Sequence, residues 1–229
     1  MGDDHRKDPT LDEVLASAAR LQDVVPGAVL VGGSAAAHYA HHRRSIDHHH
    51  VVADLAERFE TILSNLEALD EWSTARATPG KLILGSLGGI ESGIRQLRRS
   101  RPLEVESVEV GGRPLVVPTL DETLRVKAWL ALTRNQTRDY VDLAALASVS
   151  GVDHAALMLG EIDDFYSDIY RGDDRVATQL VRQLGAPQPR DRRVTTELAS
   201  YRQLDPRWHD WSRVVEVTST IARLMVEQS

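Results

Sequence analysis

The sequence predicts an α/β (α+β) protein in which a core of strands and helices is followed by a helical C-terminal domain. Two observations support this prediction. As far as Val117, short apolar runs bounded by glycine and turn residues alternate with amphipathic stretches, which is typical of strands alternating with helices. After Pro118 the turn-rich strands give way to helical patterns. We therefore expect a boundary near this proline, with one domain over residues 1–118 and a second over residues 119–229.

In the first half, the expected elements begin or end at recognisable signals. Thr10 is an N-cap for an amphipathic helix that ends at Pro26-Gly27. Gly32-Gly33-Ser34 separates a short apolar strand from an alanine-rich helix, and Gly111-Gly112 is typical of a hairpin turn. The expected helices cover residues 11–24, 35–39 and 55–68, and the expected strands cover residues 28–31, 45–52, 81–84, 103–110 and 113–117.

In the second half, Thr119 is a cap signal with acidic residues in the following turn, and the helix that it begins should run to about Leu132. The further helices are expected over residues 137–149, 154–159, 162–170, 175–184, 195–204 and 211–226. Residues 161–174 contain six acidic residues and one arginine. We interpret that stretch as a solvated outer face or a surface for a partner.

Composition narrows the classes of function. The 229 residues include no cysteine, which excludes disulfide scaffolds and cysteine-ligated zinc or iron–sulfur sites. The polar segment 1–8 has neither a secretory nor a myristoylation signal, and no apolar run is long enough to span a bilayer. We therefore expect a soluble cytoplasmic protein with no membrane partner.

The net charge of −7 argues at first against a nucleic-acid partner, because phosphate backbones are bound by lysine and arginine. The charge is unevenly distributed, however. Arg95, Arg98, Arg99 and Arg101 follow one another with no acidic residue between them, and they would lie on one side of a helix. Such a patch fits a triphosphate or an RNA backbone. A solvated face is the alternative.

Six of the nine histidines lie between His38 and His50. In a strand, Asp47 and His49 point to one side, while His48 and His50 point to the other. A carboxylate and an imidazole two residues apart can bind a divalent metal ion, and the imidazole shifts the preference toward zinc or manganese. A polar strand face exposed to solvent is the alternative interpretation.

These residues carry a resemblance to a known family. Gly33-Ser34 and the segment His42-Arg43-Arg44-Ser45-Ile46-Asp47-His48-His49 resemble the first motif of the DNA polymerase β-like nucleotidyltransferases, specifically the AbiEii-type toxins that include MenT. Leu124-Arg125-Val126-Lys127-Ala128 and Arg138-Asp139-Tyr140-Val141-Asp142-Leu143 are similar to the family's lysine helix and Arg-Asp-x-x-Asp helix. The matching motifs span roughly residues 28–147, about half of the chain.

The resemblance implies a metal-dependent nucleotidyltransferase core that contains a mixed β-sheet, with Mg²⁺ or Mn²⁺ as cofactor. The expected reaction transfers a nucleoside monophosphate from a nucleoside triphosphate to an RNA acceptor, such as the 3′ end of tRNA. The family also implies a toxin role and a cognate antitoxin. The residues expected to bind nucleotide are Gly32, Gly33, Ser34, Arg43, Ser45, Arg95, Arg98 and Arg99; those expected in catalysis are Asp47, Lys127, Asp139 and Asp142; those expected at the metal are Asp47, His49, Glu104 and Glu106.

The chain departs from the family at one position, because His49 stands where the pattern has its second aspartate. A carboxylate lost there removes a negative charge and a hard oxygen ligand, so magnesium affinity and catalytic rate should fall. Three explanations are open: a natural variant that uses another metal, a degenerate homologue, or a substitution introduced to silence a toxic enzyme. The alternative function is a non-catalytic protein of this fold that binds nucleotide or RNA. A third possibility is transfer to a protein side chain or a small molecule.

The remaining candidates come from other segments. The family places a third acid on a strand next to the Asp47 strand, and Glu104 and Glu106 share a face of an expected strand, so either could serve. A half-exposed edge strand is the alternative. Lys127 suits contact with a triphosphate, although it could equally be a surface lysine. Asp139 and Asp142 nearly share a helix face, where Asp142 could orient Lys127 or the acceptor hydroxyl; structural ion pairing is the alternative.

Overall fold

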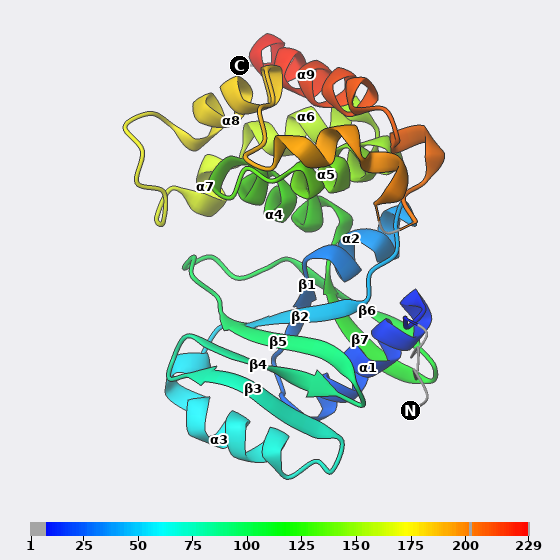
Figure 1. Cartoon of the computed structure of the whole chain (residues 1–229). Coiled ribbons are helices and arrows are strands. Elements are labelled where there is room, and N and C mark those ends of the chain that lie inside the picture. The colour runs from blue at the N-terminus through cyan, green and yellow to red at the C-terminus, as the bar shows by residue number, and fades with distance from the viewer. Residues whose placement is uncertain (1–7, 202, 229) are drawn as a thin grey trace.

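The computed structural model describes residues 8–201 and 203–228, so residues 1–7 of the polar N-terminal segment lie outside the described residues. The described chain forms two bodies, one built around a β-sheet and one built of helices (Figure 1). The chain passes from the first body to the second at the end of β7, where the strand ends at Pro118 and α4 follows.

The sheet body contains three helices and seven strands within the described residues. Its helices are α1 (Leu11–Val24), α2 (Gly33–Ala40) and α3 (Leu55–Glu67). Its strands are β1 (Val29–Val31), β2 (Asp47–Val52), β3 (Trp72–Thr78), β4 (Leu82–Leu87), β5 (Ile90–Gln96), β6 (Val105–Val110) and β7 (Arg113–Pro118).

The helical body follows. Its α-helices are α4 (Leu120–Thr133), α5 (Thr137–Ser150), α6 (Val152–Gly160), α7 (Asp163–Tyr166), α8 (Val176–Gly185) and α9 (Trp211–Glu227). Its 3-10 helices are η1 (Arg192–Thr196), η2 (Leu198–Ser200) and η3 (Pro206–Trp208).

Five strands form a sheet in the order β1-β2-β5-β4-β3. Strand β2 pairs with β5 in parallel, and every other pair in this sheet is antiparallel. The sheet is therefore mixed, as the resemblance implies. Strands β6 and β7 form a separate hairpin, whose turn residues Gly111 and Gly112 both have positive φ angles. That conformation is the reason why two glycines stand at this turn.

One face of the sheet is covered by α1 and α3. Side chains of α3, such as Phe59 and Ile62, form a core with Leu21 of α1 and with Ile83 and Ile94 of the sheet. The burial of β2 alternates along the strand, and His48, His50 and Val52 are its buried members. Since side chains of a strand alternate between the faces, Asp47, His49 and Val51 lie on the opposite face.

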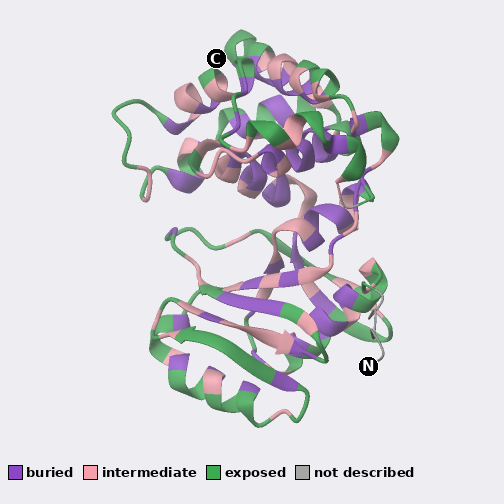
Figure 2. Ribbon diagram, in the orientation of Figure 1, coloured by how far each residue is buried: buried purple, intermediate pink, exposed green. Residues whose placement is uncertain are grey.

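The helical body has its own core, which is centred on α5 (Figure 2). Helix α2 takes part in it through Ala36 and Ala40, although this helix precedes most of the sheet in sequence. The two bodies are therefore packed together through α2 as well as joined at Pro118. Within residues 8–201 and 203–228, no single helix is long and apolar enough to cross a membrane; α5 and α6 would reach that length and hydropathy only together, with a bend of 113° between them.

Several expected elements differ from the structure. The helix expected over residues 195–204 is wrong, because η1 and η2 occupy this region as short 3-10 turns. The helix expected over residues 162–170 is reduced to the single turn α7. Strands β3 and β5 were not expected. The arginine segment 95–101 is not helical, since Arg95 and Gln96 end β5 and the rest is a loop.

Candidate functional site

The face of the sheet opposite to α1 and α3 carries a group of polar side chains on β2 and β5. In the parallel ladder, Asp47 pairs with Glu91, His49 with Gly93, and Val51 with Arg95. Paired residues of neighbouring strands point to the same side of a sheet. Two carboxylates, one imidazole and one guanidinium therefore share this surface, which we call the Asp47–His49 face.

The imidazole of His49 lies across β5 at a position that only glycine permits. A Cβ atom on Gly93 would be 2.6 Å from His49 Cδ2 and 3.0 Å from Nε2, closer than side-chain atoms approach one another. On its other side, His49 Nδ1 is 3.7 Å from Asp47 Oδ2, which is too long for a hydrogen bond. The ring is thus seated on the sheet beside Asp47 with its side chain 37% exposed.

The positive charges of three arginines affect the pKa of this imidazole. Burial lowers the pKa of His49, Asp47 raises it, and the positive charges of Arg95, Arg138 and Arg134 lower it further. The net direction is downward, so His49 is a neutral imidazole at neutral pH. Arg95 comes from β5, whereas Arg134 follows α4 and Arg138 lies in the first turn of α5. Two of the positive charges that act on His49 therefore belong to the helical body.

These arginines retain unused hydrogen-bond donors. Arg138 Nε and Arg134 Nε are buried and have no hydrogen-bond partner among the described residues. Arg134 donates from Nη2 to Asp139 Oδ1 at 2.6 Å, so its charge is partly balanced. A buried donor without a partner costs free energy unless a ligand or water satisfies it.

Asp47 is positioned by two buried serines. The hydroxyl of Ser34 donates to the main-chain oxygen of Asp47 and lies 3.0 Å from Ser45 Oγ. Ser45 Oγ in turn donates to Asp47 Oδ1 at 3.4 Å. Both serines are almost completely inaccessible. Their hydroxyls are directed at the start of β2, and the expectation that they contact nucleotide stays a prediction.

The glycine turn before α2 also has a packing role. A Cβ atom on Gly33 would lie 2.6 Å from Arg43 Nη2, so glycine allows the guanidinium to approach the helix. Gly32 is the N-cap of α2 and has a positive φ of 85°. The alternative that the turn serves tight packing therefore accounts for Gly33, whereas Gly32 is explained by its positive φ.

Arg43 belongs to a second group, which we call the Asp142 cluster. Asp142 is completely buried, and its Oδ1 accepts from Arg43 Nε at 2.6 Å and from His42 Nε2 at 2.7 Å. Its Oδ2 accepts from Lys127 Nζ at 2.6 Å and from Arg43 Nη2 at 3.0 Å. The cluster joins the segment before β2 to α4 and α5.

Electrostatics in the Asp142 cluster follow from burial and pairing. Although burial alone raises the pKa of Asp142, the charges of Arg43 and Lys127 hold it well below its usual range. Burial lowers the pKa of Lys127, and Asp142 opposes that shift. Lys127 is 2% exposed and bonded to Asp142, so the interpretation as a surface lysine is wrong. Its contact with a triphosphate stays a prediction.

Asp139 forms its ion pair with Arg134, not with its neighbour Arg138 in the motif. Its Oδ1 accepts from Arg134 instead, and its Oδ2 is buried without a hydrogen-bond partner. One turn of α5 thus separates Asp139, which faces the arginines, from Asp142, which faces the Asp142 cluster. The two aspartates have different surroundings although the sequence motif treats them alike.

Arg99 is corrected from a nucleotide ligand to a structural residue. It is buried, with Nη2 2.7 Å from Glu122 Oε1, and it donates to the main-chain oxygens of Arg101 and Pro102. Arg98 is exposed on the loop after β5. Of the arginines expected to form one patch, only Arg95 lies on the Asp47–His49 face.

Glu104 and Glu106 do not complete the site either. Strand β6 pairs only with β7, so neither glutamate lies on the strand next to β2. Glu104 accepts from Arg125 Nη1 at 2.7 Å, and Glu106 accepts from the hydroxyl of Tyr39. The acid on the neighbouring strand is Glu91.

Sequence reasoning missed Glu91, Gly93 and Arg134. A signal for the first two was present, because Glu91, Gly93 and Arg95 alternate with Ser92 and Ile94 over a strand-length segment. The register that sets Glu91 beside Asp47 has no local signal, because it depends on which strands pair.

The residues present do not fit the divalent-metal centre that the resemblance implies. Among residues 8–201 and 203–228, no three histidine, aspartate or glutamate side chains converge closely enough to hold a metal ion. Hard cations such as Mg²⁺ take several oxygen ligands, whereas His49 replaces one carboxylate here. This face offers the carboxylates of Asp47 and Glu91, while the positive charges of Arg95, Arg134 and Arg138 oppose a cation there.

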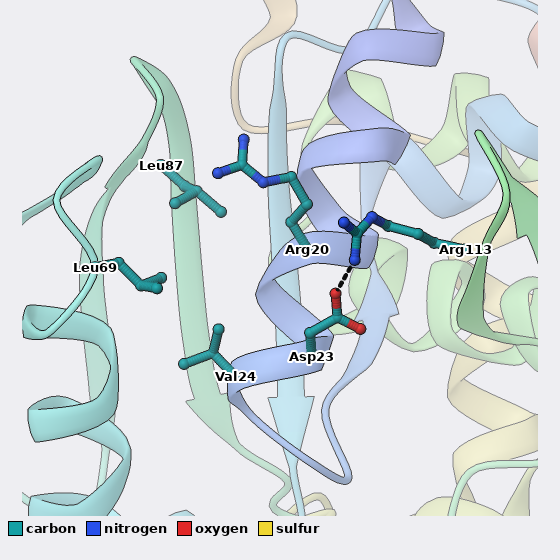
Figure 3. A pocket seen from close by; sticks show the side chains of 6 residues that line it. All are labelled: Arg20, Asp23, Val24, Leu69, Leu87 and Arg113. Atoms are coloured by element: carbon teal, nitrogen blue, oxygen red, sulfur yellow. Dashed lines mark hydrogen bonds and ion pairs between the residues drawn. The ribbon is translucent and has the colours of Figure 1, made fainter.

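A separate small pocket of about 180 Å³ lies between α1, β4 and β7 (Figure 3). Val24, Leu69 and Leu87 form its apolar wall. Its two arginines are already paired, Arg20 with Glu71 and Arg113 with Asp23. This pocket therefore lacks the unused donors of the Asp47–His49 face.

Comparison with known proteins identifies the fold. No protein-family model matches the chain. A candidate nucleotidyltransferase from H. pylori has a similar structure, with a TM-score of 0.54 and 16% sequence identity over 95% of this chain and 94% of that one. An antigenic nucleotidyltransferase-like protein from Paracoccidioides brasiliensis gives a TM-score of 0.49 and 14% identity over 86% and 95% of the two chains. The first likeness shows a nucleotidyltransferase-like fold.

The proteins that resemble this chain in sequence are transport proteins. A stretch of 137 residues is 34% identical to the mycolic acid-containing lipids exporter MmpL11 of Mycolicibacterium smegmatis, covering 58% of this chain and 14% of the exporter. A stretch of 95 residues is 41% identical to the heme uptake protein MmpL11 of Mycobacterium tuberculosis, covering 41% of this chain and 10% of that protein. The chain thus spans a small part of these relatives, whose transport activities are properties of the whole proteins.

Proposed function

We propose that the chain binds a nucleoside triphosphate on the Asp47–His49 face. The observation that carries this proposal is the positive charge of Arg95 on the same face, together with the buried donors of Arg134 and Arg138 that have no partner among the described residues and whose charges act on His49. Guanidinium groups match the geometry of phosphate oxygens and bind them through charge-assisted hydrogen bonds. The nucleotidyltransferase-like fold supports the same class of ligand by analogy.

The proposal is tested by titrating the full chain with ATP, GTP, CTP and UTP in a calorimeter. We expect at least one of them to bind, and Arg138→Gln to weaken that binding about tenfold, the loss of one charge-assisted hydrogen bond. Arg76→Gln is the matched control, because Arg76 is exposed on β3, at the far edge of the same sheet. Absence of binding by all four nucleotides, or equal losses in both variants, would overturn the proposal.

A second candidate is transfer of a nucleoside monophosphate from this nucleotide to an RNA acceptor, the 3′ end of tRNA in particular. It is favoured by the positioning of Asp47 through Ser34 and Ser45, and by Glu91 beside it on β5. The AbiEii-type resemblance adds a toxin role and a cognate antitoxin to this candidate. The incomplete set of carboxylates favours nucleotide binding as the first function.

Labelling separates the two candidates. The chain and a His49→Asp variant are each incubated with labelled nucleoside triphosphates, total tRNA and Mg²⁺ or Mn²⁺. Labelling by the Asp form alone would show that His49 disables a transferase scaffold. No labelling by either form, with tRNA or with protein and small-molecule acceptors, would overturn the transferase candidate and leave the binding function.

A further inference from the structure

The segment between β5 and β6, residues 97–104, makes contact with the helical body through its own side chains. In Figure 1 it rises from the end of β5 toward α7, whereas α2 lies against the helical body on the other side. We infer that this segment, which we call the 97–104 clasp, is a positioning element that holds the helical body in one orientation relative to the Asp47–His49 face. The inference rests on the proposed function, because it concerns how the two halves of that nucleotide site are held together.

The first step of the argument is a buried ion pair between the two bodies. Arg99 is 4% exposed although it lies in a loop, and its Nη2 is 2.7 Å from Oε1 of Glu122, a fully buried residue in the first turn of α4. Arg99 also donates from Nε and Nη2 to the main-chain oxygens of Arg101 and Pro102, at 2.9 and 3.0 Å. Since a buried ion pair is favourable only at close, hydrogen-bonded geometry, it restricts the relative orientations that the two bodies can adopt.

The second step is the aromatic ring of Phe165 in α7, which meets guanidinium groups from both bodies. Cζ of Arg101, in the clasp, is 3.8 Å from the centroid of this ring, and Cζ of Arg125, in α4, is 4.0 Å from it. Cζ of Arg99 lies 4.9 Å from the centroid of the neighbouring ring, Tyr166. A cation is attracted to the face of an aromatic ring, more strongly where water is excluded, and both rings are buried. The clasp is therefore seated on α7 by contacts that depend on the position of these rings.

The third step is the charge balance of the clasp. Arg125 Nη1 is 2.7 Å from Oε2 of Glu104 and 3.1 Å from Oε2 of Glu122. Asp168 accepts a hydrogen bond from a main-chain N–H of the clasp at 2.6 Å. Nη1 of Arg99 and Nε of Arg125 have no partner among the described residues, but each of these guanidiniums is paired with a carboxylate. The cluster is therefore a contact between two parts of the chain.

The fourth step is the connection between the clasp and the Asp47–His49 face. Strand β5 carries Arg95 on that face and ends one residue later, three residues before Arg99. Helix α4, which provides Glu122, ends at Thr133 and is followed by Arg134, whose Nε is buried without a partner among the described residues. The clasp thus ties β5 to α4. Without it, we expect fewer molecules in which Arg95 and Arg134 can contact one ligand.

The inference is tested first by a distance between the two bodies. The chain has no cysteine, so spin labels attach only to cysteines that are introduced. Glu60→Cys on α3 and Asp153→Cys on α6 place one label at an exposed position of each body. Double electron–electron resonance should give one narrow distribution of distances in this labelled chain and a broad one when Arg99→Ala is added. Arg182→Ala, which removes an arginine from an exposed ion pair within the helical body, is the matched control and should leave the distribution narrow.

Calorimetric titration with nucleotide gives the second readout. If about a tenth of the Arg99→Ala molecules keep the original orientation, the apparent affinity falls about tenfold. Saturating nucleotide should narrow the distribution again, because the ligand favours the orientation that binds it, and a merely structural role would not give this recovery. Phe165→Leu, which keeps an apolar side chain but removes the ring, should act in the same direction and replaces Arg99→Ala if that variant does not fold. Circular dichroism spectra establish that each variant is folded.

The outcomes separate the inference from the proposed function. Unchanged distances in the folded variants would overturn the inference and leave the proposed function standing. Altered distances with unchanged nucleotide affinity would also overturn the inference alone, because the clasp would then not position the site. Failure of every nucleotide to bind to the unaltered chain would overturn the proposed function, and with it the inference.

Discussion

The Asp142 cluster and the Asp47–His49 face are both built from charged side chains near the junction of the two bodies, but they differ in how completely those side chains are partnered. Asp142 accepts four hydrogen bonds from Arg43, His42 and Lys127 and is sealed from solvent. On the Asp47–His49 face, Arg138 and Arg134 keep buried donors without a partner. The difference teaches that motif residues whose charges are paired inside the protein maintain the structure. In the Asp142 cluster only a neutral ring atom, His42 Nδ1, lacks a partner among the described residues, whereas on the Asp47–His49 face the unused donors belong to guanidinium groups.

The largest effect is expected from Asp142→Asn, which leaves Arg43 and Lys127 buried without their counter-charge. Removing one member of a buried ion pair costs about 3–5 kcal/mol of unfolding free energy. Urea denaturation followed by circular dichroism measures this loss, with Asp174→Asn as an exposed control. If Asp142→Asn left stability unchanged but abolished nucleotide binding, Asp142 would belong to the ligand site and the comparison would be wrong.

The second prediction concerns pH and the two sides of β2. Burial lowers the pKa of His48 to about 3 and that of His50 well below its usual range, so both are neutral when folded. In the unfolded chain each binds a proton below about pH 6.5. Stability is therefore full above that pH and is lost as pH falls toward the folded pKa, by about 2 kcal/mol per histidine at pH 5.

Denaturation between pH 8 and pH 5 measures this loss. His50→Leu removes one of the two histidines, and the pH dependence should become shallower by about half of the loss expected for the pair. Leu157→Gln, at an exposed leucine of α6, removes no titratable group and should leave the slope unchanged. An equally steep slope in His50→Leu would contradict the assignment of the acid sensitivity to the inner side of β2.

A smaller effect is expected from Gly93→Ala, which tests the seat of His49. The added Cβ overlaps the imidazole, so the ring should move toward solvent at a cost of about 1–3 kcal/mol in stability. Its pKa should then rise, because burial is the main cause that lowers it. NMR titration of His49 measures the rise. Gly160→Ala, with no atom within 4 Å of the new Cβ, is the control, and an unchanged His49 pKa would show that the ring does not depend on Gly93.

The smallest effect is expected from Arg95→Gln. Removing one of the charges that lower the pKa of His49 should raise that pKa, and only slightly, since an exposed charge is well screened. NMR titration at low salt measures the shift, and high salt should reduce the difference between the two proteins. A pKa that falls would mean that Arg95 is not among the charges acting on His49.

Much of the fold could be predicted from local signals. The capped helix α1, the hairpin of β6 and β7, and the helices α4, α5 and α9 lie within one or two residues of the expected ranges. Strand β3 was missed because five of its seven residues are exposed, so no alternation of polar and apolar residues marks it. Strand β5 was missed because its outward side chains, Glu91 and Arg95, belong to the site and its middle residue is glycine.

The candidate site was predicted only in part. Alternation in β2 placed Asp47 and His49 on one face, and this holds because the two-residue period of a strand is a local property. The family pattern did not reveal that Lys127 and Asp142 are sealed, or that Glu104 and Glu106 lie in another sheet. Burial and pairing depend on residues far away in the chain.

The sequence alone thus determined the alternation of strands and helices in the core, the helical second half and the side of β2 that carries Asp47 and His49, since periodicity, caps and turns are read within a few residues. Only the tertiary structure decided that Glu91 is the neighbour of Asp47, that the charges of Arg95, Arg134 and Arg138 act on His49, and that Asp142 is enclosed. Strand order and the packing of one body on another bring together side chains about 50 to 100 positions apart, and the charges they meet there set which groups remain available to a ligand.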